Sequence, residues 1–533
     1  MLNWEKSKRG WQLNKIAKHL NHYITGAVYG EFPVLEGYST DRSILKIRPK
    51  VVAVPRTAGD IRKLVRFSNQ LALKNYKLPV TVRGSGLDKT GAAIGPGMII
   101  SMEEMDHVKE IDPRQRLVRL QTGVTLGALN TALSLHNLIL PVDGDPNQTI
   151  GGLIANDYGN LRSRITQAEI VLSNGDIIQT ERLRPRRLNR KKGATGFEGE
   201  LYRQLDNFLL DHAEDLANIT PGTRTGYATI PQIKVKNGSF DILSAFFGSQ
   251  GTLGIITEII LNCDLSDEPN QFFIAAFPSA NTALNFIEYA AKIKPSAIDI
   301  YDTNLFTIAT ESGKKFRPLK SLPENGIVVN VSLNDSNKRH RSRKINRLTA
   351  LLNKSTRYAV SNNDNYANFI ELKTILSVYF NQHPHTIHAP ITDDTFIPFK
   401  QLKKYFTAIA ELEDKHKIAL PIFGSVLANR YSVRPEIDLG SVTGRQFALA
   451  FMREYNELIM DCDGSFAGGS AEGRLKAIFV NTHLDPELKK LYQEFKTIFD
   501  PNSILNPDVK QGANIRAVVR ALRTSYNTGI IKE

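Results

Sequence analysis

The chain of 533 residues contains only two cysteines, Cys263 and Cys462. Two thiols are too few for a disulfide framework, a four-thiolate zinc site or a cysteine-ligated iron–sulfur cluster. Any electron carrier therefore has to be held by groups other than thiolates.

The chain also lacks long apolar segments. No run approaches the roughly 20 apolar residues that span a bilayer. Residues 1–10 have no apolar core of the kind that a signal peptide requires. These two absences predict a cytoplasmic protein.

The formal net charge of +14 is concentrated in two patches, residues 182–192 and 338–344. Neither patch interleaves aromatic residues as a nucleic-acid platform does, so we expect no nucleic-acid partner. Two interpretations stay open. The patches are solvated loops, or they contact anionic lipid at the inner face of the membrane or an acidic partner.

The length of the chain calls for two or three domains. Between residues 46 and 261, strands are predicted at 51–54, 80–82, 98–100, 117–120, 170–172 and 255–261, with helices at 57–73 and 126–136. Asn174-Gly175 predicts a tight hairpin turn in which both central residues have positive φ. The pattern is that of an α+β domain rich in strands.

From about residue 267 the pattern changes. Strands are predicted at 272–277, 327–333 and 418–423, and helices at 279–293, 338–352, 399–416 and 447–462. This order favours an antiparallel sheet covered by helices on one face. We divide the chain into an N-terminal helical extension (1–45), a first domain (46–265), a second domain (266–480) and a C-terminal segment (481–533).

Three glycine-rich stretches lie in the first domain. Residues 83–91 (RGSGLDKTG) follow a strand, and their glycines allow consecutive backbone N–H groups to turn inward as a nest for a diphosphate. The spacing fits neither the Rossmann fingerprint nor a P-loop. Residues 141–159 and 247–258 also place glycines where a large flat ligand can press on the backbone.

With these stretches, the sequence resembles the vanillyl-alcohol oxidase and D-lactate dehydrogenase superfamily. That family carries, in this order, a P-x-x-V-x-x-P entry strand, R-G-x-G-T-x-x-x-G, T-I-G-G-x-x-A-N and G-S-x-G-T-L-G-I-I-T-E, and it ends in F-D-P-x-x-I-L-N-P. The corresponding segments here are residues 49–57, 83–91, 149–156, 248–258 and 499–507. The resemblance runs from about residue 38 to 507 and is nearest the D-lactate and 2-hydroxyglutarate dehydrogenase branch.

The resemblance implies a PCMH-type FAD-binding domain of two α/β subdomains, a cap domain with an antiparallel sheet covered by helices, and a C-terminal segment that returns to the FAD domain. Leu87 stands where the family has Thr, and no His occupies the usual flavin-linking position of the first loop, so we expect non-covalent FAD. The implied FAD-binding residues are Pro55, Arg83, Gly84, Ser85, Gly86, Leu87, Thr90, Gly91, Pro141, Asp145, Thr149, Ile150, Gly151, Gly152, Asn156, Gly159, Gly251, Gly254, Ile255, Ile256 and Asn506.

The cap domain departs from the family at its metal and base motifs. Relatives in this branch carry G-H-x-G-D-G-N-x-H and G-E-H-G, whose histidines and glutamate bind a divalent metal and take the substrate proton. Here the aligned ligand positions are Ser425 and Ser432 in the first motif, and Gly469 and Ser470 in the second. A serine hydroxyl replaces imidazole neither as a divalent-metal ligand nor as a base near neutral pH. We therefore predict no metal site.

Other side chains of the cap have to supply the chemistry. Arg430, Arg434 and Arg474 are candidates for binding a substrate carboxylate or phosphate, because a guanidinium fork matches such anions, although each can equally form an ordinary ion pair. The candidate bases are Tyr431, Glu472 and the cluster of His383, His385 and His388, which can also be a solvated loop before Pro390.

The sequence favours an FAD-dependent oxidoreductase that transfers hydride from the CH–OH group of a small, anionic substrate, such as a D-lactate-like 2-hydroxy acid, to flavin N5. The electrons then pass to a quinone, dioxygen or another carrier. Two alternatives stay open: oxidation of a sugar or polyol of the aldonolactone type, and a flavoprotein without turnover that acts as a binding or assembly subunit. A homodimer is also open.

Overall fold

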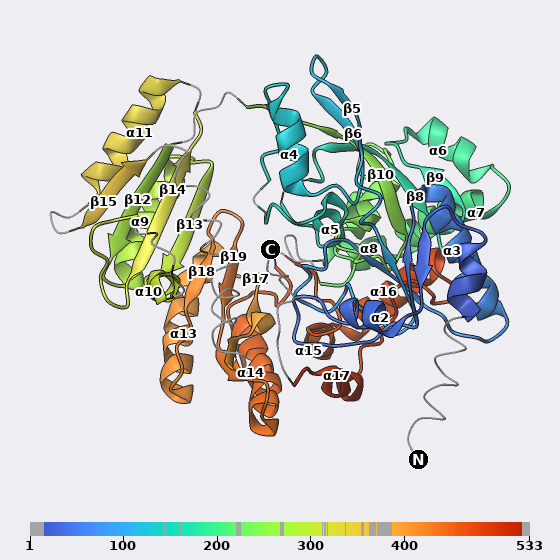
Figure 1. The fold of residues 1–533 in the computed structure, drawn as a ribbon. Coiled ribbons are helices and arrows are strands. Elements are labelled where there is room, and N and C mark those ends of the chain that lie inside the picture. The colour runs from blue at the N-terminus through green and yellow to red at the C-terminus, as the bar shows by residue number, and fades with distance from the viewer. Residues whose placement is uncertain are drawn as a thin grey trace. The chain divides into compact units, whose positions relative to one another are not determined.

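The computed structural model describes residues 15–524, apart from positions 143, 160, 220–224, 267–270, 312, 314–315, 317, 336, 353–355, 362–368, 370–371, 373–385 and 469. The chain folds into two compact units. Unit 1 comprises Met1–Ser266 and Ser470–Leu522, and unit 2 comprises Asp267–Gly469 and Arg523–Glu533 (Figure 1). Residues 470–480, which we predicted in the second domain, therefore belong to unit 1.

The first sheet of unit 1 has the strand order β1 (Ala27–Tyr29), β2 (Val51–Val54), β4 (Met98–Ser101) and β3 (Val80–Arg83). Strands β2 and β3 both run parallel to β4. Helix α3 (Ala58–Leu73) follows β2 and provides the crossover that parallel strands need, and the Thr57 hydroxyl caps its N-terminus. Because β1 pairs with β2, this part of the predicted N-terminal extension belongs to the first sheet of unit 1.

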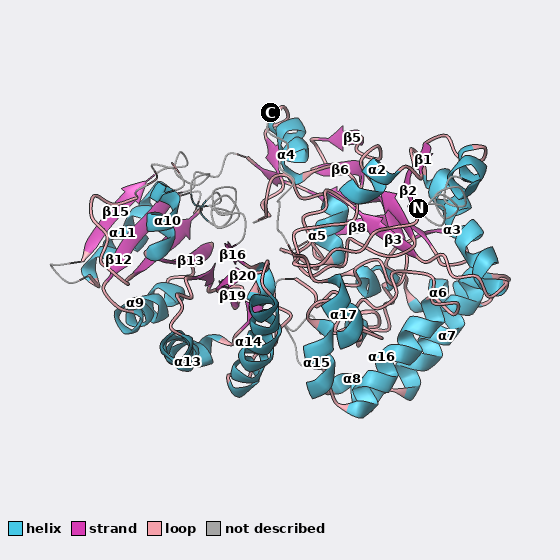
Figure 2. Ribbon diagram, turned by 60° about the horizontal axis from the view of Figure 1, so that its bottom comes forward, coloured by secondary structure: helices cyan, strands magenta, loops and turns pink. Residues whose placement is uncertain are grey.

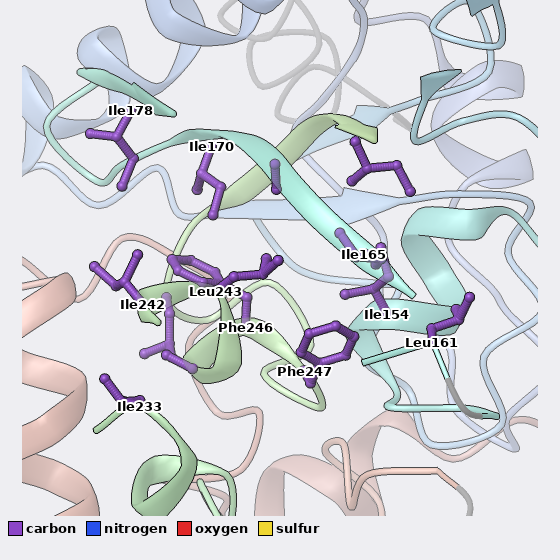
Figure 3. Close-up of a cluster of buried hydrophobic side chains, with 14 of the residues drawn as sticks. Ile154, Leu161, Ile165, Ile170, Ile178, Ile233, Ile242, Leu243, Phe246 and Phe247 are labelled. Carbon is purple, nitrogen blue, oxygen red and sulfur yellow. The ribbon is translucent and has the colours of Figure 1, made fainter. Parts of the chain in front are cut away.

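The second sheet of unit 1 is antiparallel, with the order β5 (Val108–Asp112), β6 (Leu117–Gln121), β10 (Ile255–Asn262), β8 (Ile165–Val171) and β9 (Ile177–Gln179). A short ladder joins β7 (Leu138–Ile139) to β11 (Asp264–Leu265). Side chains of β8 such as Ile170 pack on Leu243 and Phe246 of the 3-10 helix η2 (Ile242–Phe246) in a buried apolar cluster (Figure 3). Two sheets with their helices match the predicted pair of subdomains.

The predicted hairpin between β8 and β9 is present, but its turn differs from the expected one. The backbone N–H of Gly175 donates to the Leu172 carbonyl at 2.8 Å, so the turn spans residues 172–175. Gly175 has a φ of +82°, whereas Asn174 is not in the positive-φ region. The glycine therefore follows the turn rather than forming its centre, as in a three-residue hairpin loop with a bulge.

Unit 1 contains further helices besides α3 and η2. They are α2 (Phe32–Gly37), α4 (Leu126–Ser134), α5 (Ile150–Ala155), α6 (Pro185–Lys192), α7 (Phe197–Asp211), α8 (Ala213–Ala217), α15 (Ala477–His483), α16 (Pro486–Phe499), α17 (Ile515–Ala521) and the 3-10 turn η1 (Ile230–Gln232). After α16, Leu505 bridges to Val80 of β3, so the C-terminal segment returns to the first sheet.

Unit 2 is built on a seven-stranded antiparallel sheet. Its strand order is β15 (Arg357–Ser361), β12 (Gln271–Phe277), β14 (Ile327–Leu333), β13 (Ala297–Asp302), β18 (Ile422–Ser425), β19 (Arg430–Val433) and β17 (Thr395–Phe396). A separate ladder joins β16 (Thr386–His388) to β20 (Glu436–Asp438). The antiparallel sheet was predicted, whereas β13, β15, β17 and β19 were not recognised in the sequence.

Helices flank this sheet. Phe286 of α9 (Ala280–Lys292) packs on Phe273 and Phe277, and α13 (Leu402–His416) lies beside α9 (Figure 2). The other helices described here are α11 (Lys338–Ala350), α14 (Val442–Asp461) and the 3-10 turns η4 (Pro390–Thr392) and η5 (Phe399–Gln401). Helix α14 begins five residues before the predicted start because Ser441 caps it. We predicted helices on one face of the sheet, but the opposite face also carries a helix. The short α10 (Asn304–Glu311) packs against the opposite face, with Tyr301 and Val328.

None of the helices in the described ranges is long and apolar enough to span a bilayer.

Candidate functional site

The first glycine loop follows β3 directly and is shaped by close backbone contacts. A Cβ atom on Gly84 would lie 2.1 Å from Oγ1 of Thr149. Gly86 has a φ of +72°, and a Cβ there would lie 2.3 Å from the Arg83 guanidinium. Both positions therefore require glycine, for different reasons: one for a close approach between two segments, the other for a left-handed backbone.

The loop leaves backbone donors available to a ligand. Asp88 Oδ1 accepts hydrogen bonds from the backbone N–H groups of Thr90 (2.8 Å) and Ala92 (2.9 Å), which fixes the second half of the loop. Within the described ranges, no group accepts a hydrogen bond from the N–H of Ser85, Gly86 or Leu87. Three consecutive N–H groups of this kind suit a phosphate anion.

These donors border a pocket within unit 1. Twelve of the predicted FAD residues line it, namely Gly84, Ser85, Gly86, Leu87, Thr149, Gly151, Gly152, Asn156, Gly251, Gly254, Ile255 and Ile256. The structure thus brings the three glycine stretches together around one cavity.

The remaining predicted cofactor residues are not among those that line this pocket. Arg83 lines an adjoining hollow, donates to the Thr40 carbonyl at 2.7 Å and lies over the Tyr38 ring. Asp145 forms an ion pair with Arg42. Pro55 and Ile150 are buried, Pro141 is exposed, and Gly91 and Gly159 have positive φ. Asp143, in the same stretch, lies outside the described residues.

Sequence reasoning missed several residues of the pocket. Those not predicted are Val82, Asp88, Ala92, Ala93, Met102, Thr122, Gln148, Ala155, Phe246, Ser249 and Gln250. Val82, Thr122 and Gln250 each adjoin a strand end or glycine stretch that we had singled out, and that position was the available signal. Phe246 directly precedes the third glycine stretch, and Met102 lies two residues after the strand predicted at 98–100, so the same signal applied to them.

A polar network behind the pocket joins its walls. Gln250 donates from Nε2 to Asn156 Oδ1 at 2.9 Å and accepts at Oε1 from the Gly473 N–H at 2.9 Å. Asn506 donates from Nδ2 to the carbonyl oxygens of Ala92 (2.9 Å) and Gln250 (2.8 Å). The C-terminal segment of unit 1 therefore ties the first and third glycine stretches together.

Arg474 serves the same network. It is 4% exposed, and its guanidinium donates to the carbonyl oxygens of Ile94 and Pro507 and to Asn506 Oδ1. Burial lowers the pKa of Arg474 to about 10, so it stays charged at neutral pH. These contacts favour a role in positioning the pocket wall over the predicted role in substrate binding.

Glu472 is also taken up by internal contacts. Its carboxylate is fully buried, pairs with Lys510 Nζ at 2.9 Å and accepts from the Gly226 N–H at 2.7 Å. Lys510 Nζ donates in addition to the Gly226 carbonyl at 2.6 Å. A carboxylate held in this way is a structural ion pair, which disfavours the predicted role of general base.

In unit 2, Arg434 and Tyr431 are likewise occupied by packing. The buried Arg434 guanidinium binds the carboxylate of Asp393 through two hydrogen bonds and lies over the Phe423 ring. Burial raises the pKa of the Tyr431 hydroxyl far above its usual value, which disfavours it as a base. Its ring packs on Tyr405 of α13 in the core. Arg430, on β19, is only half-buried.

His388 is the third of the predicted bases that lie within the described residues. Its side chain is 6% exposed, and Nδ1 lies 3.2 Å from the Arg434 carbonyl oxygen. A carbonyl only accepts hydrogen bonds, so Nδ1 carries a proton, and the neutral form of His388 is the tautomer protonated there. Burial lowers the pKa of His388, which favours this neutral form. His383 and His385 lie outside the described residues.

Comparisons with known proteins agree with this architecture. Residues 49–181 match the family model for the FAD binding domain, and residues 267–509 match that for the C-terminal domain of FAD-linked oxidases. The chain belongs to the FAD-linked oxidase family. Its fold is similar to that of 4-ethylphenol oxidase from Gulosibacter chungangensis, with a TM-score of 0.65, 14% identity and coverage of 97% of this chain and 99% of the other.

Among curated relatives, D-2-hydroxyglutarate dehydrogenase of Haemophilus influenzae is 24% identical over 88% of this chain and 48% of its own length. D-lactate dehydrogenase of Archaeoglobus fulgidus is 22% identical over 89% of this chain and 96% of its own length. The chain spans about half the length of the D-2-hydroxyglutarate dehydrogenases that it matches.

The cofactor of this FAD-linked oxidase is FAD, and the pocket of unit 1 fits it. The free N–H groups of Ser85, Gly86 and Leu87 suit its diphosphate, and the glycines Gly84 and Gly151 line the same pocket. The predicted fold and cofactor are thereby confirmed.

Proposed function

We propose that this protein oxidises the CH–OH group of a small anionic 2-hydroxy acid. Bound FAD supplies the acceptor for the hydride that leaves the carbinol carbon. The proposal is supported by the FAD-linked oxidase architecture and by relatives named for D-2-hydroxyglutarate and D-lactate. The observation that carries it is the buried His388, whose Nδ1 lies 3.2 Å from the Arg434 carbonyl oxygen and whose imidazole is kept neutral by burial.

In the proposed oxidation, the candidate residues have different roles. His388 removes the hydroxyl proton at Nε2 as the C–H bond breaks. Arg430 binds the substrate carboxylate, because its guanidinium fork matches such an anion. Tyr431, Glu472, Arg434 and Arg474 maintain the structure of their units. FAD is held without a covalent bond.

The chemistry proceeds without a divalent metal in this proposal. Ser432 Oγ accepts a hydrogen bond from the Asp394 N–H at 2.9 Å, so this hydroxyl stabilises the local backbone. Within the described part of the chain, no three His, Cys, Asp or Glu side chains form a metal-binding group. General-base catalysis by His388 replaces the metal-assisted step of the dehydrogenase branch.

The test is an anaerobic titration of the purified, yellow protein with D-lactate, D-2-hydroxyglutarate and a set of aldoses and polyols. We expect a 2-hydroxy acid to bleach the flavin absorbance, and EDTA to leave the rate unchanged. Dithionite controls for a reducible flavin. If dithionite bleaches the flavin and no hydroxy acid does, the proposed activity is wrong. Bleaching by sugars alone favours the aldonolactone-type alternative.

The loss of the metal-site histidines also supports a second candidate, a flavoprotein without turnover that acts as a binding or assembly subunit. Ser425, Ser432 and Ser470 stand at three ligand positions of the branch. A flavin that no substrate reduces, together with stable co-purification of another protein, favours this candidate over the enzyme.

The basic helices support contact with an acidic surface. On α11, Arg339, Arg343 and Arg347 recur every four residues and form a stripe. In the described ranges, none of these three arginines forms an ion pair. Their charges repel one another along the helix, which an anionic lipid surface or an acidic electron acceptor relieves. The proposal also includes a homodimer, which sedimentation of the purified protein tests.

A further inference from the structure

A row of polar side chains crosses the central strands of the unit 2 sheet. Asn330 of β14 lies directly opposite Asp299 of β13, Asp299 opposite Ser425 of β18, and Ser425 opposite Arg430 of β19. Directly opposed residues of antiparallel strands point to the same face of the sheet. These four side chains therefore form one continuous row. Asn330, Asp299 and Ser425 are all at least nine-tenths buried.

The adjacent row on the same face is apolar. Val328, Tyr301 and Phe423 lie two residues away on β14, β13 and β18, and they pack with α10 in a hydrophobic cluster. The fold of this sheet is thus compatible with apolar residues on this face. Asparagine is also a poor strand former, so its presence in a central strand calls for another explanation.

Asn330 and its neighbour Ser332 have unsatisfied polar atoms. Asn330 is 0% exposed, and no group in the described part of the chain bonds to its Nδ2 or Oδ1. Ser332, two residues further along β14 on the same face, is 6% exposed, and its Oγ also lacks a hydrogen-bond partner there. Burying an amide and a hydroxyl without partners is costly, and natural proteins rarely tolerate it without a ligand or an ordered water.

The chemistry of the row selects the kind of ligand. An amide both donates and accepts hydrogen bonds, and serine hydroxyls do the same, which suits the hydroxyl groups of a ligand. The Asp299 carboxylate accepts from hydroxyls, and the Arg430 guanidinium at the other end matches a carboxylate. Neighbouring strands are roughly 5 Å apart, so the row of four strands extends for about 14 Å. A three-carbon acid is too short to contact both ends.

We propose that the row Asn330–Asp299–Ser425–Arg430, with Ser332 beside it, binds a polyhydroxylated carboxylate of the aldonic-acid type. This inference rests on the proposed oxidation of a 2-hydroxy acid and names the class of that acid. Arg430 binds the carboxylate end, and the Asn330 amide and Ser332 hydroxyl bind hydroxyls at the far end. Asn330 is then a specificity-determining residue that selects long hydroxylated acids over lactate.

The test compares D-gluconate with D-lactate on the FAD-loaded protein. We expect D-gluconate to bind at least 10-fold more tightly than D-lactate by isothermal titration calorimetry. Asn330→Leu, which keeps the shape of the side chain and removes its polar atoms, should weaken D-gluconate binding at least 10-fold and D-lactate binding less than 3-fold. Its unliganded unfolding temperature should equal or exceed that of the wild type, because an unsatisfied amide is removed.

Two serine variants provide a matched pair. Ser332→Ala removes the unpartnered hydroxyl and should weaken D-gluconate binding about 3- to 10-fold. Ser296→Ala removes a hydroxyl of the same unit that already donates to the Ser332 carbonyl at 2.8 Å, and it should leave binding unchanged. Ser332→Ala also keeps the test informative if Asn330→Leu fails to fold.

Binding and flavin reduction are measured separately, which distinguishes this inference from the proposed function. If D-lactate bleaches the flavin but D-gluconate does not bind, or binds equally well to wild type and both row variants, the ligand row is wrong and the oxidoreductase stands. If D-gluconate binds in an Asn330-dependent way but no hydroxy acid bleaches the flavin, the row stands and the activity is wrong. Unchanged binding with a higher unfolding temperature in Asn330→Leu would assign the site to ordered water and overturn the inference.

Discussion

Arg474 donates a 2.9 Å hydrogen bond from Nη2 to Oδ1 of Asn506, and this contact leaves the Asn506 amide nitrogen to bind the carbonyl oxygens of Ala92 and Gln250. Both of these residues line the FAD pocket. The pair therefore connects the C-terminal segment of unit 1 with two of the three glycine stretches. Arg474, which is not among the residues that line the pocket, thus contributes to the shape of the pocket through Asn506.

We predict that Asn506→Ala weakens FAD binding at least 10-fold, because two carbonyl groups of the pocket wall lose their donor. Arg474→Met should have a smaller effect in the same direction, since it frees the Asn506 side chain to rotate. Dialysis followed by fluorescence titration of the apoprotein with FAD measures both affinities. Equal FAD affinity in Asn506→Ala and the wild type would contradict this role.

Gly84→Ala tests the close approach between the first and second glycine stretches. The added Cβ would lie 2.1 Å from Thr149 Oγ1, so one segment has to move and the pocket is disturbed. We expect purified Gly84→Ala to lack bound flavin while it still folds. Gly59→Ala, in the first turn of α3, meets only Thr57 Oγ1 at 3.5 Å and should keep its flavin. The ratio of flavin absorbance to protein absorbance measures how much flavin each variant retains. A yellow Gly84→Ala protein would refute the prediction.

The sequence predicts the cofactor loop of unit 1 better than it predicts the roles of the polar residues elsewhere. The need for glycine at Gly86 arises from its left-handed backbone and from the nearby Arg83 side chain, so the motif alone predicted the cofactor loop. The occupation of Arg434 by Asp393 and of Glu472 by Lys510 depends on pairs separated by 41 and 38 residues. Residue type suggested chemistry at these positions, and only the fold reveals that their charges are already neutralised. The row through Asn330 depends on strand register, which short apolar runs do not determine.

The Glu472–Lys510 pair yields a prediction on stability. Lys510→Met leaves the Glu472 carboxylate buried without a counter-charge, and we expect a loss of about 3–5 kcal/mol in the apparent free energy of unfolding. The double variant Glu472→Leu/Lys510→Met should recover most of this loss. Urea unfolding of the wild type, Glu472→Leu, Lys510→Met and the double variant gives the coupling energy. The alternative, in which Glu472 is the catalytic base, predicts instead that Glu472→Gln folds normally and loses flavin reduction.

The protonation state of His388 should determine how kcat/KM depends on pH. The base acts only when Nε2 is unprotonated, so kcat/KM should be constant at neutral pH and fall as the pH drops through the pKa of His388. Burial lowers that pKa below its ordinary value near 6.5, so the fall should be centred below pH 6.5. His388→Gln should keep its flavin and lose about 10²- to 10⁴-fold in kcat, the usual contribution of a general base. Asn456→Leu, at another buried polar side chain of unit 2, controls for nonspecific disturbance of the unit. A pH profile of His388→Gln that retains the acidic limb at unchanged kcat would assign the titration to another group and remove His388 from the mechanism.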